Sequence, residues 1–226
     1  MDQQEINLIA TFKTVAGFGA KYAAEFPATS PGGIQFAVVA AAIPTTATLG
    51  AAQLAGADQK HGGVLSKAVA RVLIHEDLVT LSDAAHSLAL LGVPGLEGKF
   101  HLPRSGGDQA WLNAARVFNT DATALKTKFL EVGLLPDFPE QFAAHISALE
   151  AAISSKGSGT VAEAGATGGL EDTTHKAAIA LTVLNTIVRN TFKKSPIKLA
   201  EWVTASHVEK HTPVSHAKPT PPPVKL

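Results

Sequence analysis

The sequence predicts an all-α protein: an up-and-down antiparallel bundle of about six helices, with a short C-terminal helix and an extended Pro-rich tail. Apolar residues recur at spacings of three and four through most of the 226 residues. No run of β-branched and aromatic residues alternates with period two. Sequential helices joined by short loops pack antiparallel. We therefore expect one bundle domain over residues 1–211 and a tail over residues 212–226.

The N-terminal half predicts three helices, over residues 3–25, 33–56 and 62–91. Turn-forming residues at 27–33 separate the first two. In the second helix Pro44 removes a backbone donor and should bend the helix, and a face of mostly small residues should point inward: Ile34, Val38, Ala41, Thr45, Thr48 and Ala52. The third helix is apolar at almost every angle, which is typical of a helix buried on most sides. We expect it at the centre of the bundle.

The C-terminal half predicts helices over residues 108–131, from Asp137 onward, over 170–192, and from Ser195 to about Ser206. Asp108 is a candidate cap near the start of the first, and Gly133 is well placed just after its end. Glycines at 156–169 weaken helix propensity, so we expect fraying or a break there. Ser195 followed by Pro196 is typical of an N-cap with proline at the first helical position.

Charge and composition exclude several classes of function. The 19 basic and 19 acidic side chains give zero net charge, which argues against general nucleic-acid binding. The chain has no Cys, so it has no disulfide framework, thiolate metal site or Cys nucleophile. The polar, acidic first residues do not resemble a secretory signal, and no stretch reaches about 18 unbroken apolar residues. We expect a cytoplasmic chain, with export by another route left open, and no membrane span.

The surface is expected to carry unusually little charge. Ala supplies 39 residues, and charged residues are 17% of the chain against a typical quarter. A helical protein normally solvates its outer faces with Lys and Glu. Either this surface is weakly charged, or other subunits cover much of it.

Several segments resemble a group of uncharacterised helical proteins of soil and environmental bacteria. They include the run Gly133 to Phe138, then Leu184 to Asn190, and then Trp202 to Glu209. The resemblance covers about residues 60–210 and is strongest over 108–209. It implies a bacterial origin and an all-helical fold, and it implies no activity and no site residue.

Histidines supply the candidates for a metal site. His75 and His86 are about 16 Å apart along one helix face, too far to share a metal. His207 and His211 would share a helix face and could hold Zn²⁺ or Ni²⁺. We interpret the first pair as core or edge histidines and the second as solvated tail residues. The chain has no Glu-x-x-His motif of the kind that di-iron bundles use. No metal or other cofactor is assigned.

No catalytic constellation is complete. Ser195 and Lys198 spell Ser-x-x-Lys, but the partner motifs of penicillin-recognising enzymes are absent and helix capping already explains Ser195. Gly17 and Gly19 lack the third glycine of a dinucleotide fingerprint. His101 and Arg104 lie in a Gly- and Pro-rich loop, a common functional location, and leave an unrecognised hydrolase open. We expect a protein that is not an enzyme.

These observations predict a structural or interaction protein that assembles with copies of itself. The tail is expected to dock on a neighbour by its low-entropy polyproline shape, and an Ala-rich face of residues 33–56 is expected at the contacts. The tail residues assigned to this interface are Pro219, Pro221, Pro222, Pro223, Val224 and Leu226. The alternative is a small-molecule or metal binder with a polar pocket between helices, lined by His75, Glu76, Asp83 or His86.

Overall fold

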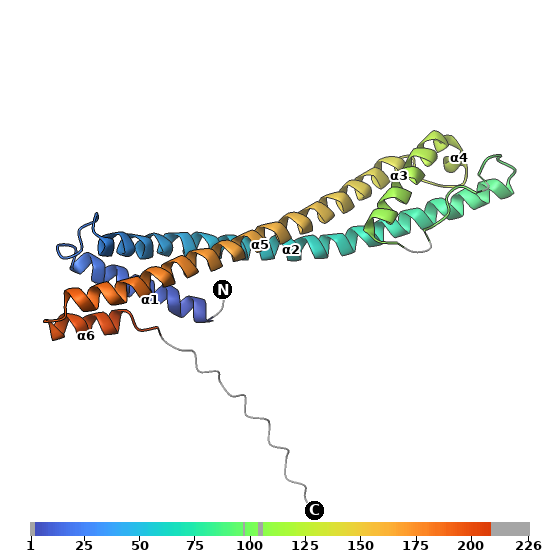
Figure 1. The fold of residues 1–226 in the computed structure, drawn as a ribbon. Helices are drawn as coiled ribbons and strands as arrows, with labels where there is room; N and C mark the ends of the chain where they lie inside the picture. Colours follow the sequence, from blue (N-terminus) through green and yellow to red (C-terminus); the bar gives the residue numbers. More distant parts are fainter. Residues whose placement is uncertain (1–2, 97, 104–105, 209–226) are drawn as a thin grey trace, which may run out of the picture. The chain divides into compact units, whose positions relative to one another are not determined.

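The fold is all-α. The computed structural model describes residues 3–96, 98–103 and 106–208, and within them it contains six helices and no strand (Figure 1). In chain order they are α1 (Gln3–Lys21), α2 (Pro31–Leu90), α3 (Asp108–Ala124), α4 (Lys126–Glu131), α5 (Phe138–Thr191) and α6 (Pro196–Ala205). The two long helices α2 and α5 pack antiparallel. The predicted fold class is confirmed. The Pro-rich tail lies outside the described residues.

Two predicted interruptions are wrong, because α2 and α5 are each continuous. Residues 57–61, expected to separate two helices, are helical, and α2 runs through 60 residues and through Pro44. Residues 156–169, expected to fray or break, are helical within the 54 residues of α5. The low helix propensity of glycine predicted these breaks. Packing of α2 against α5 explains much of why the breaks do not occur.

Glycines let the backbones of α2 and α5 approach closely. A Cβ atom built at Gly63 would lie 2.5 Å from the backbone nitrogen of Lys156, and one at Gly56 would lie 2.6 Å from that of Glu163. In the opposite direction, a Cβ at Gly159 would collide with the backbone of Lys60. These glycines are spacers, and packing offsets their cost of about 1 kcal/mol each in helix propensity. No comparable contact explains Gly157, Gly165 or Gly168.

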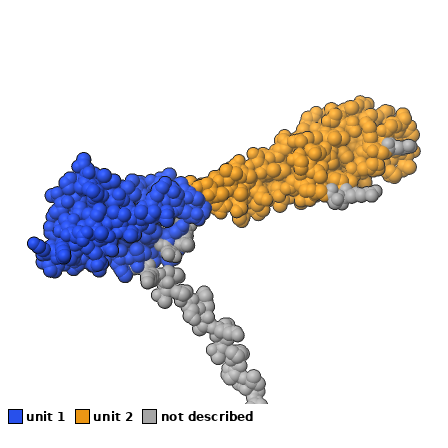
Figure 2. Space-filling view, in the orientation of Figure 1, with its two compact units in different colours: residues 1–51, 166–226 blue, residues 52–165 orange. Residues whose placement is uncertain are grey.

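The chain divides into two compact units, and both long helices contribute to each (Figure 2). Unit 1 comprises Met1–Ala51 and Ala166–Leu226, and unit 2 comprises Ala52–Gly165. The loop over residues 92–107 lies inside unit 2. The expectation of one domain over residues 1–211 stays a prediction.

Unit 1 has an aromatic core. Phe18 contacts Trp202 at 5.1 Å between ring centroids, and Phe26 contacts Phe192 at 5.6 Å, both edge to face. Trp202 is fully buried, and its indole Nε1 donates to Oδ1 of Asn185 on α5 at 3.1 Å. These contacts join α6 to α1 and α5, so the short C-terminal helix is an integral part of this unit.

Unit 2 has an aliphatic core with a cluster of Phe rings. The larger side chains that α2 contributes to it are Ile74, Leu78, Leu81 and Leu88. Phe100, in the loop before α3, has a φ of 58°, a left-handed conformation that bulky residues rarely adopt. Its ring is buried against Phe118 at 5.1 Å and Phe129 at 5.5 Å. The buried ring holds the loop against α3 and α4.

The side of α2 that was expected to face inward is exposed in unit 1. Ile34 and Val38 have exposed fractions of 49% and 38%, whereas Phe36, Val39 and Ala42 are buried. Both sides of this segment are apolar, so periodicity could not choose between them, and the bulky Phe36 ring occupies the core. In unit 2, α2 is likewise not buried on most sides, because six of its large apolar side chains are exposed: Leu54, Val64, Leu65, Val69, Val72 and Leu90.

The predicted helix ends are confirmed in two places and wrong in one. Gly133 follows the C-cap Val132 with a φ of 92°, and Ser195 is the N-cap of α6 with proline at its first turn. Asp108 is not a cap. Gly107 occupies the N-cap, and the Asp108 carboxylate instead pairs with Lys67 at 2.8 Å and Arg71 at 3.3 Å on α2. The predicted helix over 108–131 is also divided at Leu125, between α3 and α4.

Candidate interaction surface

An exposed, uncharged face runs along α2 in unit 1. We call it the α2 face, and it comprises Ile34, Ala37, Val38, Ala41, Thr45 and Thr48, all exposed. These positions follow helical spacing, so the side chains form one stripe. No charged residue occurs between Glu25 and Asp58. Because the stripe has no charged side chain, a partner can cover it without the cost of removing water from a charge.

The polar groups of the α2 face are satisfied by the helix itself. The Thr45 hydroxyl donates to the carbonyl of Ala41 at 2.9 Å, and the Thr48 hydroxyl donates to the carbonyl of Pro44 at 3.1 Å. A buried hydroxyl is costly mainly when it lacks a hydrogen bond. Covering this face therefore leaves neither threonine donor without a partner.

Within the described residues, α2 is also the helix that meets the length and composition of a membrane span. Its most apolar 18-residue window has a mean hydropathy of 1.5 and is 22% buried. Core helices of soluble proteins meet the same criteria when they are mostly buried, and this window is mostly exposed. The exposed apolar surface of this α2 window is therefore a candidate contact for another protein or for lipid.

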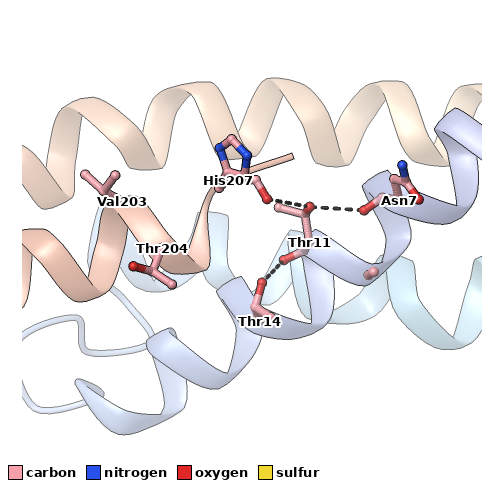
Figure 3. A pocket seen from close by; sticks show the side chains of 7 residues that line it. Asn7, Thr11, Thr14, Val203, Thr204 and His207 are labelled. Carbon is pink, nitrogen blue, oxygen red and sulfur yellow. Dashed lines mark hydrogen bonds between the residues drawn. The ribbon is translucent and has the colours of Figure 1, made fainter. Parts of the chain in front are cut away.

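A groove of about 510 Å³ lies between α1 and α6 (Figure 3). Its lining is rich in small polar side chains: Asn7, Ala10, Thr11, Thr14, Val203, Thr204 and His207. The Thr11 hydroxyl lies 3.2 Å from the carbonyl of His207, and the Thr14 hydroxyl donates to the carbonyl of Ala205 at 2.6 Å. These contacts fix the end of α6 on α1. The described chain ends at residue 208, beside this groove.

The histidine candidates occupy exposed positions. His75, Glu76, Asp83 and His86 of α2 are all exposed, and the His75 ring packs on Trp111 with centroids 5.3 Å apart. None of the four is buried, and the alternative, a binding pocket between helices lined by these residues, stays a prediction. His207 is exposed at the α1–α6 groove. His211, like the six tail residues assigned to the interface, lies outside the described residues.

One surface hollow brings together residues of the ligand or metal site predicted on α2 and of the loop that left a hydrolase open. Asp83 and His86 of α2 share a hollow of about 440 Å³ with Lys99 and His101 of the following loop. Across the described residues, no three His, Asp or Glu side chains are placed to hold a metal ion. Lys99 is paired with Asp121 at 3.4 Å. Arg104, the other loop candidate, lies outside the described residues.

Sequence reasoning missed a paired Asp and His in unit 2. The Nδ1 atom of His145 on α5 lies 2.6 Å from Oδ2 of Asp77 on α2, with both side chains about three-quarters buried. Burial raises the pKa of the Asp77 carboxyl above its ordinary value, although the hydrogen bond to His145 acts in the opposite direction. The two residues are 68 positions apart, and no local motif links them.

Asp77 also lines an open pocket of about 260 Å³ at the surface of unit 2, which we call the cavity beside Asp77. Three segments bound the cavity: α2 with Asp77, Thr80 and Leu81, the loop between α4 and α5 with Gly133, Leu134 and Leu135, and α5 with Phe138, Gln141 and Phe142. The run from Gly133 to Phe138, quoted above for the resemblance to helical proteins, thus supplies part of its wall.

Comparison with known proteins identifies no family for this chain: no family model, no curated protein and no solved structure matches it.

Proposed function

We propose that this chain is a non-enzymatic structural protein that associates with copies of itself through the α2 face. The observation that carries the proposal is the exposed stripe from Ile34 to Thr48, in a segment free of charged residues. The proposal includes a bacterial origin, which the resemblance to uncharacterised helical proteins implies, and a place in the cytoplasm.

A second copy is the occupant that the charge pattern favours. The chain has zero net charge, and the α2 face carries none, so two copies meet without repulsion. The Ala side chains let two helix axes approach closely. Ile34 and Val38, with fractional exposures of 49% and 38%, would gain the hydrophobic free energy of burial at about 25 cal/mol per Å².

The α2 face alone predicts a weak contact. The segment over residues 34–51 is about 27 Å long and a helix is about 10 Å wide, which gives a footprint of about 300 Å². A stable interface buries about 800 Å² on each partner. A stable assembly therefore needs a second contact, and we propose that the C-terminal tail, with Pro219 to Pro223, Val224 and Leu226, supplies it on a neighbouring copy.

Charge placed on the α2 face tests this proposal. The double variant Ala41→Glu, Thr45→Glu would bury two unpaired carboxylates per copy, which is strongly unfavourable. We expect sedimentation velocity to show at least a tenfold weaker self-association than for the unmodified chain. The matched control is Thr182→Glu, Thr186→Glu, on exposed positions of α5 with the same spacing, and it should associate normally.

Two results would contradict the proposal. Equal association of the two double variants would show that the α2 face is not the contact. The unmodified chain could instead stay monomeric and float with neutral phosphatidylcholine vesicles, while the Ala41→Glu, Thr45→Glu variant does not float. That result would assign the α2 face to lipid.

A further inference from the structure

The lining of the cavity beside Asp77 combines apolar residues with three polar side chains, those of Asp77, Thr80 and Gln141. Leu81 and Phe142 are almost fully buried, and Leu134 and Phe138 pack partly buried against the same core. A water molecule occupies about 30 Å³ in the liquid. The pocket of about 260 Å³ therefore has room for about nine non-hydrogen atoms with their hydrogens, if each takes the volume of one water molecule. The apolar side chains of the lining suit a hydrocarbon body of that size.

Three backbone N–H groups of the lining residues outside the regular helix ladder are already engaged. The N–H groups of Gly133, Leu134 and Phe138 donate to the carbonyls of Leu130, Phe129 and Leu135, at 3.1 to 3.2 Å. A ligand that needs donors, such as a carboxylate or phosphate, finds none of these three free.

The polar side chains of the lining add acceptors. The Thr80 hydroxyl donates its proton to the carbonyl of Glu76 at 2.9 Å, and the Gln141 amide donates to Oδ2 of Asp137 at 2.6 Å. Asp77 receives one contact, from His145 to its Oδ2 atom, and no Lys or Arg among the described residues forms an ion pair with it. The polar side chains of the lining therefore offer acceptors, and the Asp77 carboxylate has His145 as its partner and no Lys or Arg among the described residues.

We propose that this cavity binds a small organic ammonium ion whose hydrocarbon body lies against Leu81, Leu134 and Phe142 and whose N–H groups donate to Asp77. A charged donor beside a largely buried carboxylate forms the stronger class of hydrogen bond. The apolar side chains supply affinity, and the acceptors exclude anions. This binding site is independent of the self-association proposed above.

The test uses three probes with similar bodies and different heads. These are 2-phenylethylammonium, 2-phenylethanol and 3-phenylpropanoate, each titrated into the full chain and followed by ¹H–¹⁵N NMR. We expect the ammonium ion to bind at least tenfold more tightly than the alcohol and the propanoate not to bind. The amide signals of Gly133 and Leu134 should move the most.

Variants separate the carboxylate from the cavity wall. Asp77→Asn should weaken ammonium binding at least tenfold, whereas the control Asp83→Asn, an exposed aspartate on the same helix, should leave it unchanged. Equal binding of the three probes, unchanged affinity in Asp77→Asn, or no movement of the Gly133 and Leu134 signals would each overturn the proposal. The probe comparison on the unmodified chain decides the matter even if a variant folds poorly.

Discussion

At the scale of the residue, glycine in this chain has two different roles. Gly56, Gly63 and Gly159 lie where one helix backbone meets the other, and a side chain there would collide with it. Gly62 and Gly157, close to them in sequence, face open space. Composition alone cannot separate the two groups, because the difference lies entirely in what the other helix places opposite each residue.

This difference predicts opposite effects from neighbouring substitutions. Gly62→Ala should stabilise the chain by about 1 kcal/mol, because alanine favours the helix and nothing obstructs its methyl group. Gly63→Ala should destabilise it, because the methyl group meets the Lys156 backbone. Urea unfolding curves of the two variants measure both effects. Equal shifts in the two midpoints would contradict the close contact of α2 and α5.

Two aspartates should respond to pH in opposite directions. Burial raises the pKa of Asp77, so its contribution to folding is present at acid pH and is lost as the pH rises through that raised value. The Lys67 hydrogen bond holds the pKa of Asp108 below its ordinary value, so its contribution is present at neutral pH and is lost in acid.

Unfolding free energies at pH 3 and pH 7 test the signs. The unfolding free energy of the unmodified chain minus that of Asp77→Asn should be larger at pH 3 than at pH 7. The same difference taken with Asp108→Asn should be larger at pH 7, by at most about 1 kcal/mol for such a partly exposed ion pair. The same sign for both variants would refute the assigned environments.

At the scale of the element, α6 is held by one large anchor. Trp202 is fully buried against Phe18 and hydrogen-bonded to Asn185, whereas Ile197 on the same helix has an exposed fraction of 74%. Proline at the first turn and Ser195 before it predicted where α6 begins. The sequence did not indicate how much of the unit 1 core depends on this ten-residue helix.

Removing the anchor should loosen unit 1. Trp202→Ala should cost about 3–5 kcal/mol, the usual range for a buried Trp, and should increase hydrogen exchange at the α6 amides. Ile197→Ala is the control and should change stability by less than about 0.5 kcal/mol. A Trp202→Ala chain with unfolding and exchange like the unmodified chain would show that α6 is not part of the core.

At the scale of the whole molecule, the helical fold class follows from sequence, and the pairing of distant segments does not. Gly, Pro and Ser act locally, and the breaks predicted at 92–107 and 193–195 coincide with the ends of α2 and α5 and the starts of α3 and α6. The first break lies earlier than predicted, because α1 ends at Lys21 and α2 already begins at Pro31. The continuity of α2 and α5 depends on glycine contacts about a hundred residues apart, as between Gly56 and Glu163. The Asp77–His145 pair and the cavity beside it are hidden from sequence for the same reason.

The face that α2 presents was equally beyond reach from periodicity. Ile34 and Val38 fit an inner stripe as well as Phe36 and Val39 do, and only the packed core decides between them. The expected inner face lies outside, which gives the predicted self-assembly a specific surface. The tail and its role in assembly stay predictions.

Self-association of the chain would appear first in its mass in solution. Light scattering over a wide concentration range would compare the full chain with a chain truncated after Lys210. We predict a mass above the 23.4 kDa of one chain at high concentration, and a lower mass after truncation. A mass of 23.4 kDa for both chains at every concentration would contradict the account.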